Sequence, residues 1–227
     1  MTWVRHAKIA FIGSHGIRKT TAALAFASVI QRAGRSVEFA REVVRDNPLG
    51  INEGATPEAQ LWVLTSQIRR ELELAPKAEC LVTDRGVMDN FAYYLRACGS
   101  QDRYDVEPLV RSWSRTYDIV VRLTPDVEIR ADGVRSTNDR FRDEVEAILD
   151  ARLPRLVAQD RLVMQPASEI TESHDWWRLA EQLAARVGEP LLAPGVSRPL
   201  RQPRSAAPRD RSPARATEDQ LALDLGD

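Results

Sequence analysis

A short loop near the N-terminus has the residue types and spacing of a phosphate-binding loop. Gly13, Lys19 and Thr20 stand at the offsets of G-x-x-x-x-G-K-[S/T], between an apolar run at 9–12 and an Ala/Leu-rich stretch typical of a helix. Backbone N–H groups and a helix N-terminus would surround an anion there, and Lys19 would add a positive charge. The Thr20 hydroxyl would bind a magnesium ion that also contacts the phosphates. The predicted nucleotide-binding residues are Gly13, Ser14, His15, Gly16, Ile17, Arg18, Lys19, Thr20 and Thr21.

Arg18 departs from this pattern, because it stands where the second glycine is expected. The exchange costs little if the residue is helical, and much if glycine is needed for close approach to the β-phosphate. The guanidinium could lie outward or reach toward the γ-phosphate. Lysine is rare in this chain, with Lys8, Lys19 and Lys77 among 32 basic residues, which favours a specific role for Lys19.

Acids and arginines follow two of the strand-like runs. The run 80–84 ends in Asp84, which could hold magnesium or accept a proton from a substrate hydroxyl. Arg85 would point to the opposite side and grip a phosphate or a sugar. Glu42 and Arg45 are three residues apart, so one face of a short helical turn would carry both. They could orient a sugar and activate its hydroxyl, or form a surface ion pair.

The segment 124–142 is predicted to form a lid. Asp132-Gly133 allows a turn, and Arg135, Arg140 and Arg142 follow near a helix start. Arginines that close over a phosphoryl group stabilise its developing negative charge. The alternative is a solvated basic helix end.

Short apolar runs alternate with amphipathic stretches along the chain. We expect strands at Ile9–Gly13, Val37–Ala40, Cys80–Asp84, Ile119–Leu123 and Leu162–Gln165. We expect helices near Thr20–Ala33, Pro57–Leu74, Val87–Ala97, Val106–Arg115, Asp139–Val157 and Asp175–Val187. This alternation predicts an α/β protein with a parallel sheet covered on both faces, which binds ligands at the carboxyl ends of its strands.

Length and composition suit one domain, residues 1–188, followed by a tail, residues 189–227. A net charge of −1 gives no bulk attraction to nucleic acid or membrane, and no apolar stretch is long enough for a membrane span. The N-terminus leaves no room for a signal peptide before the first strand. Two unclustered cysteines suggest reduced thiols, and together these features predict a cytoplasmic protein.

The tail is rich in proline and arginine and is predicted to be disordered. Its arginines could bind nucleic acid, which is otherwise not expected as a partner. The peptide Gln220–Leu225, QLALDL, resembles the peptide by which bacterial proteins dock on the DNA polymerase sliding clamp. A glutamine at a pocket rim and leucines inside the pocket would provide the contacts.

Residues 7–187 resemble the thymidylate-kinase-like branch of phosphate-loop kinases. More narrowly, they are similar to the small AAA-type ATPase/kinase domains that include the ribosylnicotinamide kinase module of bacterial NAD regulators. The resemblance rests on Gly13–Thr21, Arg41–Arg45, Thr83–Arg85 and Asp132–Arg135. It implies a three-layer α/β/α sandwich with a five-stranded sheet in the order 2-3-1-4-5 and a helical lid.

By this resemblance, Lys19 and Thr20 serve ATP and Mg²⁺, Asp84 serves the metal or acts as base, and Glu42 serves the acceptor. Arg85, Arg135 and Arg140 would complete the catalytic set. We therefore expect magnesium-dependent transfer of the ATP γ-phosphoryl group to a nucleoside, nucleotide or riboside. The alternative is a catalytically weak regulator or ATPase in which Arg18 has replaced catalysis by sensing, recruited to the clamp by its tail. The sequence does not distinguish ATP from GTP.

Overall fold

The computed structural model describes residues 7–126 and 138–172 of the 227-residue chain. These residues belong to one of the two compact units into which the chain divides, Met1–Gly195. The other unit, Val196–Asp227, lies outside the described residues.

Five parallel strands form one sheet in the order β2-β3-β1-β4-β5. Strands β1, β3 and β4 lie in the middle, and nearly all of their residues are buried because helices cover both faces. The predicted three-layer architecture and strand order are confirmed. The strands are β1 (Ala7–Ile12), β2 (Val37–Ala40), β3 (Cys80–Asp84), β4 (Ile119–Thr124) and β5 (Leu162–Pro166).

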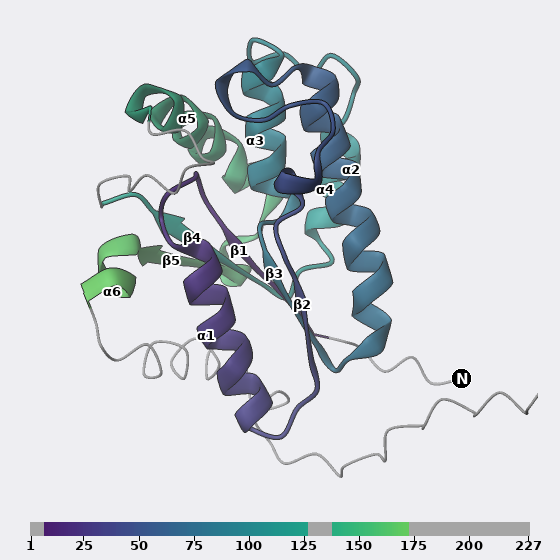
Figure 1. Cartoon of the computed structure of the whole chain (residues 1–227), viewed down its shortest axis with the longest axis vertical. Helices are drawn as coiled ribbons and strands as arrows, with labels where there is room; N and C mark the ends of the chain where they lie inside the picture. The colour runs from purple at the N-terminus through teal and green to yellow at the C-terminus, as the bar shows by residue number, and fades with distance from the viewer. Residues whose placement is uncertain (1–6, 127–137, 173–227) are drawn as a thin grey trace, which may run out of the picture. The chain divides into compact units, whose positions relative to one another are not determined.

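Helix α1 packs on one face of the sheet, and α2 to α5 pack on the other (Figure 1). Phe26 of α1 lies against Phe11 of β1, with ring centroids 5.6 Å apart. On the opposite face, Ile12 shares a core with Phe91 of α3 and Leu149 of α5. The helices are α1 (Lys19–Arg32), α2 (Pro57–Leu74), α3 (Val87–Ala97), α4 (Glu107–Ser114), α5 (Asp139–Leu156) and α6 (Ala167–Glu172).

The predicted elements agree closely with the observed ones. Helices α2 and α3 have the predicted bounds, and each strand agrees within two residues at either end. Thr56 caps α2 as its position before Pro57 suggests, accepting a hydrogen bond from the N–H of Ala59 at 3.2 Å. Helix α6 is not predicted, because six residues are too few for a helical pattern. The predicted helix Asp175–Val187 lies outside the described residues.

The chain leaves β1 and β3 toward opposite faces of the sheet, and this creates a crevice at their carboxyl ends. After β1 it enters α1 on one face, and after β3 it enters α3 on the other. The register places Phe11 opposite Asp84, so the ends of the two strands are level. Ligands of open α/β sheets bind at such a crevice.

A buried carboxylate joins α2 to the middle of the sheet. Glu71 is 1% exposed and pairs with the ammonium group of Lys8 on β1. It also accepts hydrogen bonds from Trp113 Nε1 and from the Tyr117 hydroxyl, both at 2.7 Å. Burial lowers the pKa of Lys8, although Glu71 opposes this effect. Each of these two buried charges therefore depends on the other to offset the free-energy cost of its removal from water.

The same network supports the turn that follows β3. Gln67 Nε2 donates to Glu71 at 2.9 Å and to the carbonyl oxygen of Arg85 at 3.2 Å. The Tyr117 hydroxyl accepts a hydrogen bond from the N–H of Val87, the first residue of α3, at 3.2 Å. The turn is thus held by Gln67 of α2 and by the Tyr117 hydroxyl.

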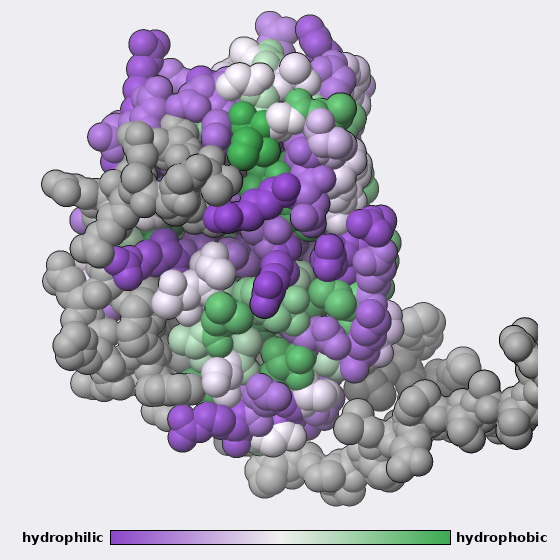
Figure 2. Space-filling model, in the orientation of Figure 1, coloured by the Kyte–Doolittle hydropathy of each residue, from purple (hydrophilic) through white to green (hydrophobic). Residues whose placement is uncertain are grey.

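The surface is mainly hydrophilic on the face shown in Figure 2, where apolar side chains form separate patches with polar groups between them. Of the helices within 7–126 and 138–172, none has both the length and the apolar character needed to cross a membrane.

Glu71→Ala should lower the free energy of unfolding by about 3–5 kcal/mol, because it leaves Lys8 buried without its carboxylate partner. Urea titration followed by circular dichroism measures this loss. The control is Glu73→Ala on the same helix, whose side chain is 46% exposed and pairs with Arg69 one turn away. It should cost no more than about 0.5 kcal/mol. Equal losses for the two variants would contradict the role of the buried network.

Candidate functional site

The loop between β1 and α1 begins at a glycine that no other residue can replace without distortion. Gly13 has a φ of +143°, a conformation that side chains disfavour. A Cβ atom at this position would lie 2.5 Å from Ile17 Cδ1 and 2.7 Å from the carbonyl oxygen of Leu123. Gly16 also has a positive φ, of 78°. The glycines therefore allow the loop to turn tightly against the end of β4.

Arg18 adopts the backbone conformation that glycine would take. Its φ of 58° and ψ of 31° are left-handed, and it immediately precedes the first turn of α1. This conformation costs an L-residue about 1–2 kcal/mol. The loop thus contains a left-handed arginine at the position where the phosphate-loop pattern has glycine, and this strained residue lies within the candidate site.

No side chain of the described residues caps the N-terminus of α1, although the Asp84 carboxylate contacts Thr20 in its first turn. Its N-cap makes no side-chain hydrogen bond, and its first turn contains no acid. By contrast, Thr56 caps α2, Asn138 caps α5, and Asp89 accepts from the backbone at the start of α3. An uncompensated helix N-terminus favours an anion.

Lys19 is buried at this end of α1, with 3% of its surface exposed. Its ammonium group donates to the carbonyl oxygen of Ser14, within the loop. Burial, and secondly the positive charge of Arg85, lower the pKa of Lys19 to about 8, although nearby acids raise it. A bound polyanion would favour the charged form of this lysine.

Thr20 and Asp84 bring two oxygen atoms together across the crevice. The Thr20 hydroxyl donates to Asp84 Oδ2 at 2.5 Å, and Asp84 is 3% exposed as the last residue of β3. Magnesium prefers oxygen ligands, and usually takes one or two from the protein and the rest from phosphates and water. The two side chains fit a magnesium ion held jointly with a nucleotide.

Arg85 and Glu42 form a buried ion pair on the other side of the same turn. Arg85 Nε donates to the Glu42 carboxylate, and the two side chains are 6% and 7% exposed. Arg85 Nη1 also lies 3.5 Å from Asp89 Oδ2, and its guanidinium lies 4.9 Å from the ring centroid of Tyr93. The arginine is therefore fixed in place by two acids and one aromatic ring.

Asp89, in the first turn of α3, is fully buried beside these groups. It accepts a hydrogen bond from the N–H of Gly86 at 2.8 Å. Burial raises the pKa of Asp89 to about 6, although Arg85 and Lys19 lower it. The crevice therefore contains two buried cations close to three acids, which are Glu42, Asp84 and Asp89.

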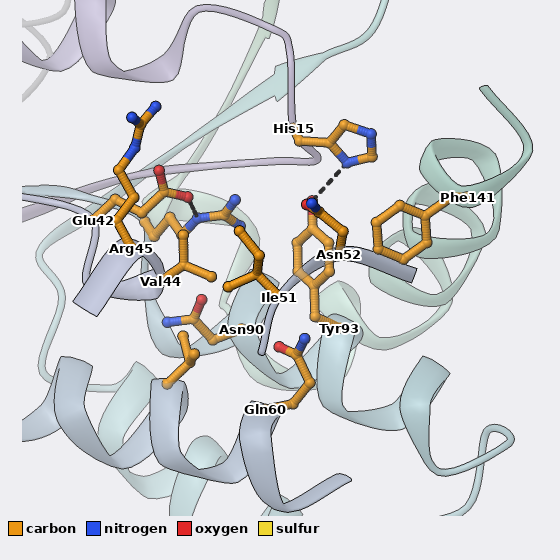
Figure 3. Close-up of a pocket in the computed structure, with 12 residues that line it drawn as sticks. His15, Glu42, Val44, Arg45, Ile51, Asn52, Gln60, Asn90, Tyr93 and Phe141 are labelled. Atoms are coloured by element: carbon orange, nitrogen blue, oxygen red, sulfur yellow. Dashed lines mark hydrogen bonds and ion pairs between the residues drawn. The ribbon is translucent and has the colours of Figure 1, made fainter. Parts of the chain in front are cut away.

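A pocket that opens to the surface lies next to the loop (Figure 3). The phosphate-binding loop contributes His15, α2 and α3 contribute polar and aromatic side chains, and the segment after β2 supplies Glu42 and Arg45. The lining residues are His15, Glu42, Val44, Arg45, Ile51, Asn52, Gln60, Val63, Arg85, Asn90, Tyr93 and Phe141.

Three rings form one side of this pocket. His15 is 4% exposed, stacks on Phe141 with centroids 5.1 Å apart, and has Nδ1 3.1 Å from the Tyr93 hydroxyl. Tyr93 and Phe141 meet edge to face at 5.8 Å. His15 thus links the loop to α3 and to α5.

The loop is also fixed to α5 through a buried carboxylate. Glu146 Oε1 accepts a hydrogen bond from the N–H of Ser14 at 2.8 Å. Glu146 pairs with Arg122 of β4, which is completely buried and also contacts Asp150 at 2.9 Å. This contact connects the phosphate-binding loop to α5, whose first residues overlap the predicted lid segment 124–142.

Some of the predicted site residues lie elsewhere. Arg140 is on α5, where its side chain is 87% exposed and pairs with Glu144 at 3.0 Å, and it does not line the pocket. Arg142 pairs with Asp139 on the same helix at 3.0 Å. Arg135 and the turn Asp132-Gly133 lie outside the described residues, as do the tail and its peptide Gln220–Leu225. Their roles remain predictions from sequence.

Several residues of this site were not predicted. Arg122 interrupts an apolar strand, and a charge in a buried strand needs a partner, so the sequence does contain a signal for it. Asn90 and Tyr93 lie on a helix that is buried on most sides, and no local pattern separates them from core positions. Gln60 and Phe141 come from separate helices and meet only in the folded chain.

Two solved structures of NadR proteins resemble this fold. One is in complex with NR, with a TM-score of 0.61 and 16% sequence identity. The other is in complex with NAD and AMP-PNP, with a TM-score of 0.54 and 13% identity. They cover 81% and 86% of this chain but 52% of each NadR chain, so the chain spans about half the length of these proteins. At such identities the likeness concerns the fold, and it confirms the predicted resemblance to a phosphate-loop kinase domain.

No curated protein matches the sequence at a significant level. The family model of an AAA domain matches residues 8–166, which include the phosphate-binding loop and all five strands. The chain therefore belongs to this family of AAA domains.

Proposed function

We propose that the protein is a magnesium-dependent kinase that transfers the γ-phosphoryl group of ATP to the hydroxyl of a small acceptor, a nucleoside, a nucleotide or a riboside. The observation that carries this proposal is the position of the Glu42–Arg85 pair. It lies in a pocket directly beside the loop that holds Lys19 and the Thr20–Asp84 oxygens. A phosphate site and an acceptor pocket share one crevice, as phosphoryl transfer requires.

Each charged side chain has a distinct role in this reaction. The loop and Lys19 hold the phosphates, and a magnesium ion on Thr20 and Asp84 neutralises their charge. Glu42 accepts the proton of the acceptor hydroxyl, because it lines the pocket. Asp84 does not line the pocket and instead bonds to Thr20, so it serves the metal. Arg85 fixes Glu42 and stabilises negative charge on the transferred group.

The ligands of the related structures agree with this arrangement. AMP-PNP is an ATP analogue, and the NadR structures contain it and NR separately. Ligands of these two kinds support the proposal of an ATP site and a site for a small acceptor. The roles of individual residues rest on the contacts described above.

A second function, that of a nucleotide-binding regulator or slow ATPase, is favoured by one observation. Arg18 keeps a strained left-handed backbone where glycine would be relaxed. A guanidinium next to the phosphates would strengthen nucleotide binding without speeding transfer. Binding of ATP without any phosphorylated product would favour this function.

Lys19→Ala should reduce turnover by at least about 10²-fold, because it removes a charge that stabilises the transferred phosphoryl group. Calorimetry with ATP, with and without magnesium, measures binding, and mass spectrometry detects phosphorylated acceptors. Lys77→Ala is the matched control, since Lys77 is exposed and does not line the pocket. Unchanged turnover in Lys19→Ala would contradict the proposed phosphate site.

The affinity for ATP should fall as the pH rises above about 8. The pKa of Lys19 is about 8 in the free protein, and bound phosphates would favour its charged form. Above this pH the free lysine is mostly neutral, so Lys19 must take up a proton when ATP binds. The affinity should be nearly constant below this pH and then fall by up to about tenfold per pH unit. Calorimetry between pH 7.5 and pH 9.5 tests this, and Lys19→Arg should flatten the profile because arginine stays charged. If the ATP affinity of Lys19→Arg still fell with rising pH, the pH dependence would belong to another group.

Arg18→Gly should raise the free energy of unfolding by about 0.5–1 kcal/mol, since relief of the left-handed strain exceeds the entropic cost of glycine. Arg69→Gly provides the opposite control. Arg69 lies in the middle of α2 with its side chain 64% exposed, so glycine there should cost about 1 kcal/mol. Denaturant titration gives both values. A loss of stability in Arg18→Gly would show that the arginine side chain supports the loop.

A further inference from the structure

The two peptide groups that meet at Ser14 contact two different charged side chains. The N–H of Ser14 donates to Glu146 Oε1 of α5 at 2.8 Å, and the carbonyl oxygen of Ser14 accepts a hydrogen bond from the ammonium group of Lys19. Ser14 itself is completely buried. A change in the backbone angles of Ser14 would turn one peptide group relative to the other, so the two contacts depend on each other.

The backbone of this part of the loop does not determine its own conformation. Gly13 and Gly16 lie on either side of Ser14 and His15 and have φ angles of 143° and 78°. Glycine adopts many conformations at little steric cost, so the segment between the two glycines needs restraints from other parts of the chain. The hydrogen bond from the Ser14 N–H to Glu146 supplies such a restraint.

Arg122 of β4 holds the Glu146 carboxylate in the place from which it contacts the loop. Arg122 is completely buried, and its Nη2 donates to Glu146 Oε2 and to Asp150 Oδ1. Its Nη1 donates to the carbonyl oxygen of Leu123, and a Cβ atom on Gly13 would lie 3.1 Å from this nitrogen. The guanidinium therefore lies directly against the start of the loop.

The pairing with Arg122 also removes an electrostatic conflict. An unpaired carboxylate beside the loop would repel the phosphates that Lys19 attracts. Because Glu146 is paired with a buried guanidinium, the loop has a strong hydrogen-bond acceptor beside it without a net negative charge. An ammonium group has three N–H donors, so Lys19 can donate to Ser14 and still use two for phosphate oxygens.

We propose that Glu146 is a positioning residue for Lys19. It fixes the backbone of Ser14, whose carbonyl oxygen directs the ammonium group toward the phosphates of ATP, while Arg122 holds and neutralises it. The proposal rests on the phosphate site of the kinase function proposed above. It goes beyond that function because it gives α5, 132 residues from Ser14 in the sequence, control over the phosphate-binding lysine.

Calorimetry with ATP and magnesium on the full chain tests this proposal with two variants of one residue. Glu146→Gln and Glu146→Met both remove the charge that pairs with Arg122, so both should lower the melting temperature. Glutamine keeps an acceptor oxygen for the N–H of Ser14, whereas methionine has none of comparable strength. Glu146→Met should therefore weaken ATP binding by about 10-fold to 100-fold, and Glu146→Gln by less than about threefold.

A double-mutant cycle tests whether Glu146 acts through the lysine. In the Lys19→Ala background, Glu146→Met should change the ATP affinity by less than about twofold, because the group that Glu146 positions is gone. Glu144→Met is the matched control. Glu144 lies on the same helix, pairs with Arg140 at 3.0 Å and does not line the pocket, so its exchange should leave the ATP affinity unchanged.

Equal ATP affinities of the two Glu146 variants would overturn the positioning role, and so would an undiminished effect of Glu146→Met in the Lys19→Ala background. If Glu146→Met does not fold, Glu146→Asp takes its place. Its shorter side chain keeps a charge for Arg122 but withdraws from the N–H of Ser14, so it should weaken ATP binding by about tenfold or more. An unchanged affinity in Glu146→Asp would overturn the role.

Failure of the kinase proposal has a different signature. In that case ATP binds and the variants show the expected pattern, but no acceptor yields a phosphorylated product. Absence of ATP binding by the wild type would overturn both proposals.

Discussion

The buried positive charge of Lys19 is the constraint on which the rest of the site depends. The side chain of Lys19 is 3% exposed, so its ammonium group needs partners that offset the buried charge. It donates a hydrogen bond to the carbonyl oxygen of Ser14, and the negative charges of Asp84 and Asp89 attract it. These partners come from three different segments, so the charge can be compensated only when the loop, β3 and α3 are in place. The lowered pKa of Lys19 shows that the compensation is incomplete without a ligand. A polyphosphate would complete it, which is why we propose that this part of the fold binds an anion.

Two other buried ionic groups hold the segments around Lys19. Glu71 ties α2 to β1, and through Gln67 it supports the carbonyl of Arg85. Glu146 ties α5 to β4 and to the first N–H of the loop after Gly13. Buried pairs of this kind add little net stability but tolerate few alternative arrangements. They fix the positions of the loop and the turn, between which the proposed substrates would bind.

The sequence predicts the elements well and the pocket poorly, for a physical reason. Strands β1 and β3 are continuous apolar runs, and α2 starts at a capping threonine and a proline, so local signals determine them. Thr20 and Asp84 lie together because α1 follows β1, whose end is level with the end of β3, and this follows from topology. Asn90 owes its place to the packing of α3 against α2, which no local pattern encodes. The exposed position of Arg140 and its ion pair with Glu144 along the same helix likewise do not follow from its spacing in the sequence.

Arg18 shows how far the loop geometry is determined by its surroundings. An arginine prefers right-handed or extended conformations, yet here it is left-handed, as glycine would be. The loop is constrained on both sides of this residue, by Gly13 against the end of β4 and by Lys19 in the crevice. The cost of the strain is smaller than the cost of displacing either contact, so the backbone keeps its path and the side chain changes. The departure from the phosphate-loop pattern therefore adds a positive charge to the loop, while the backbone keeps the left-handed conformation that glycine favours.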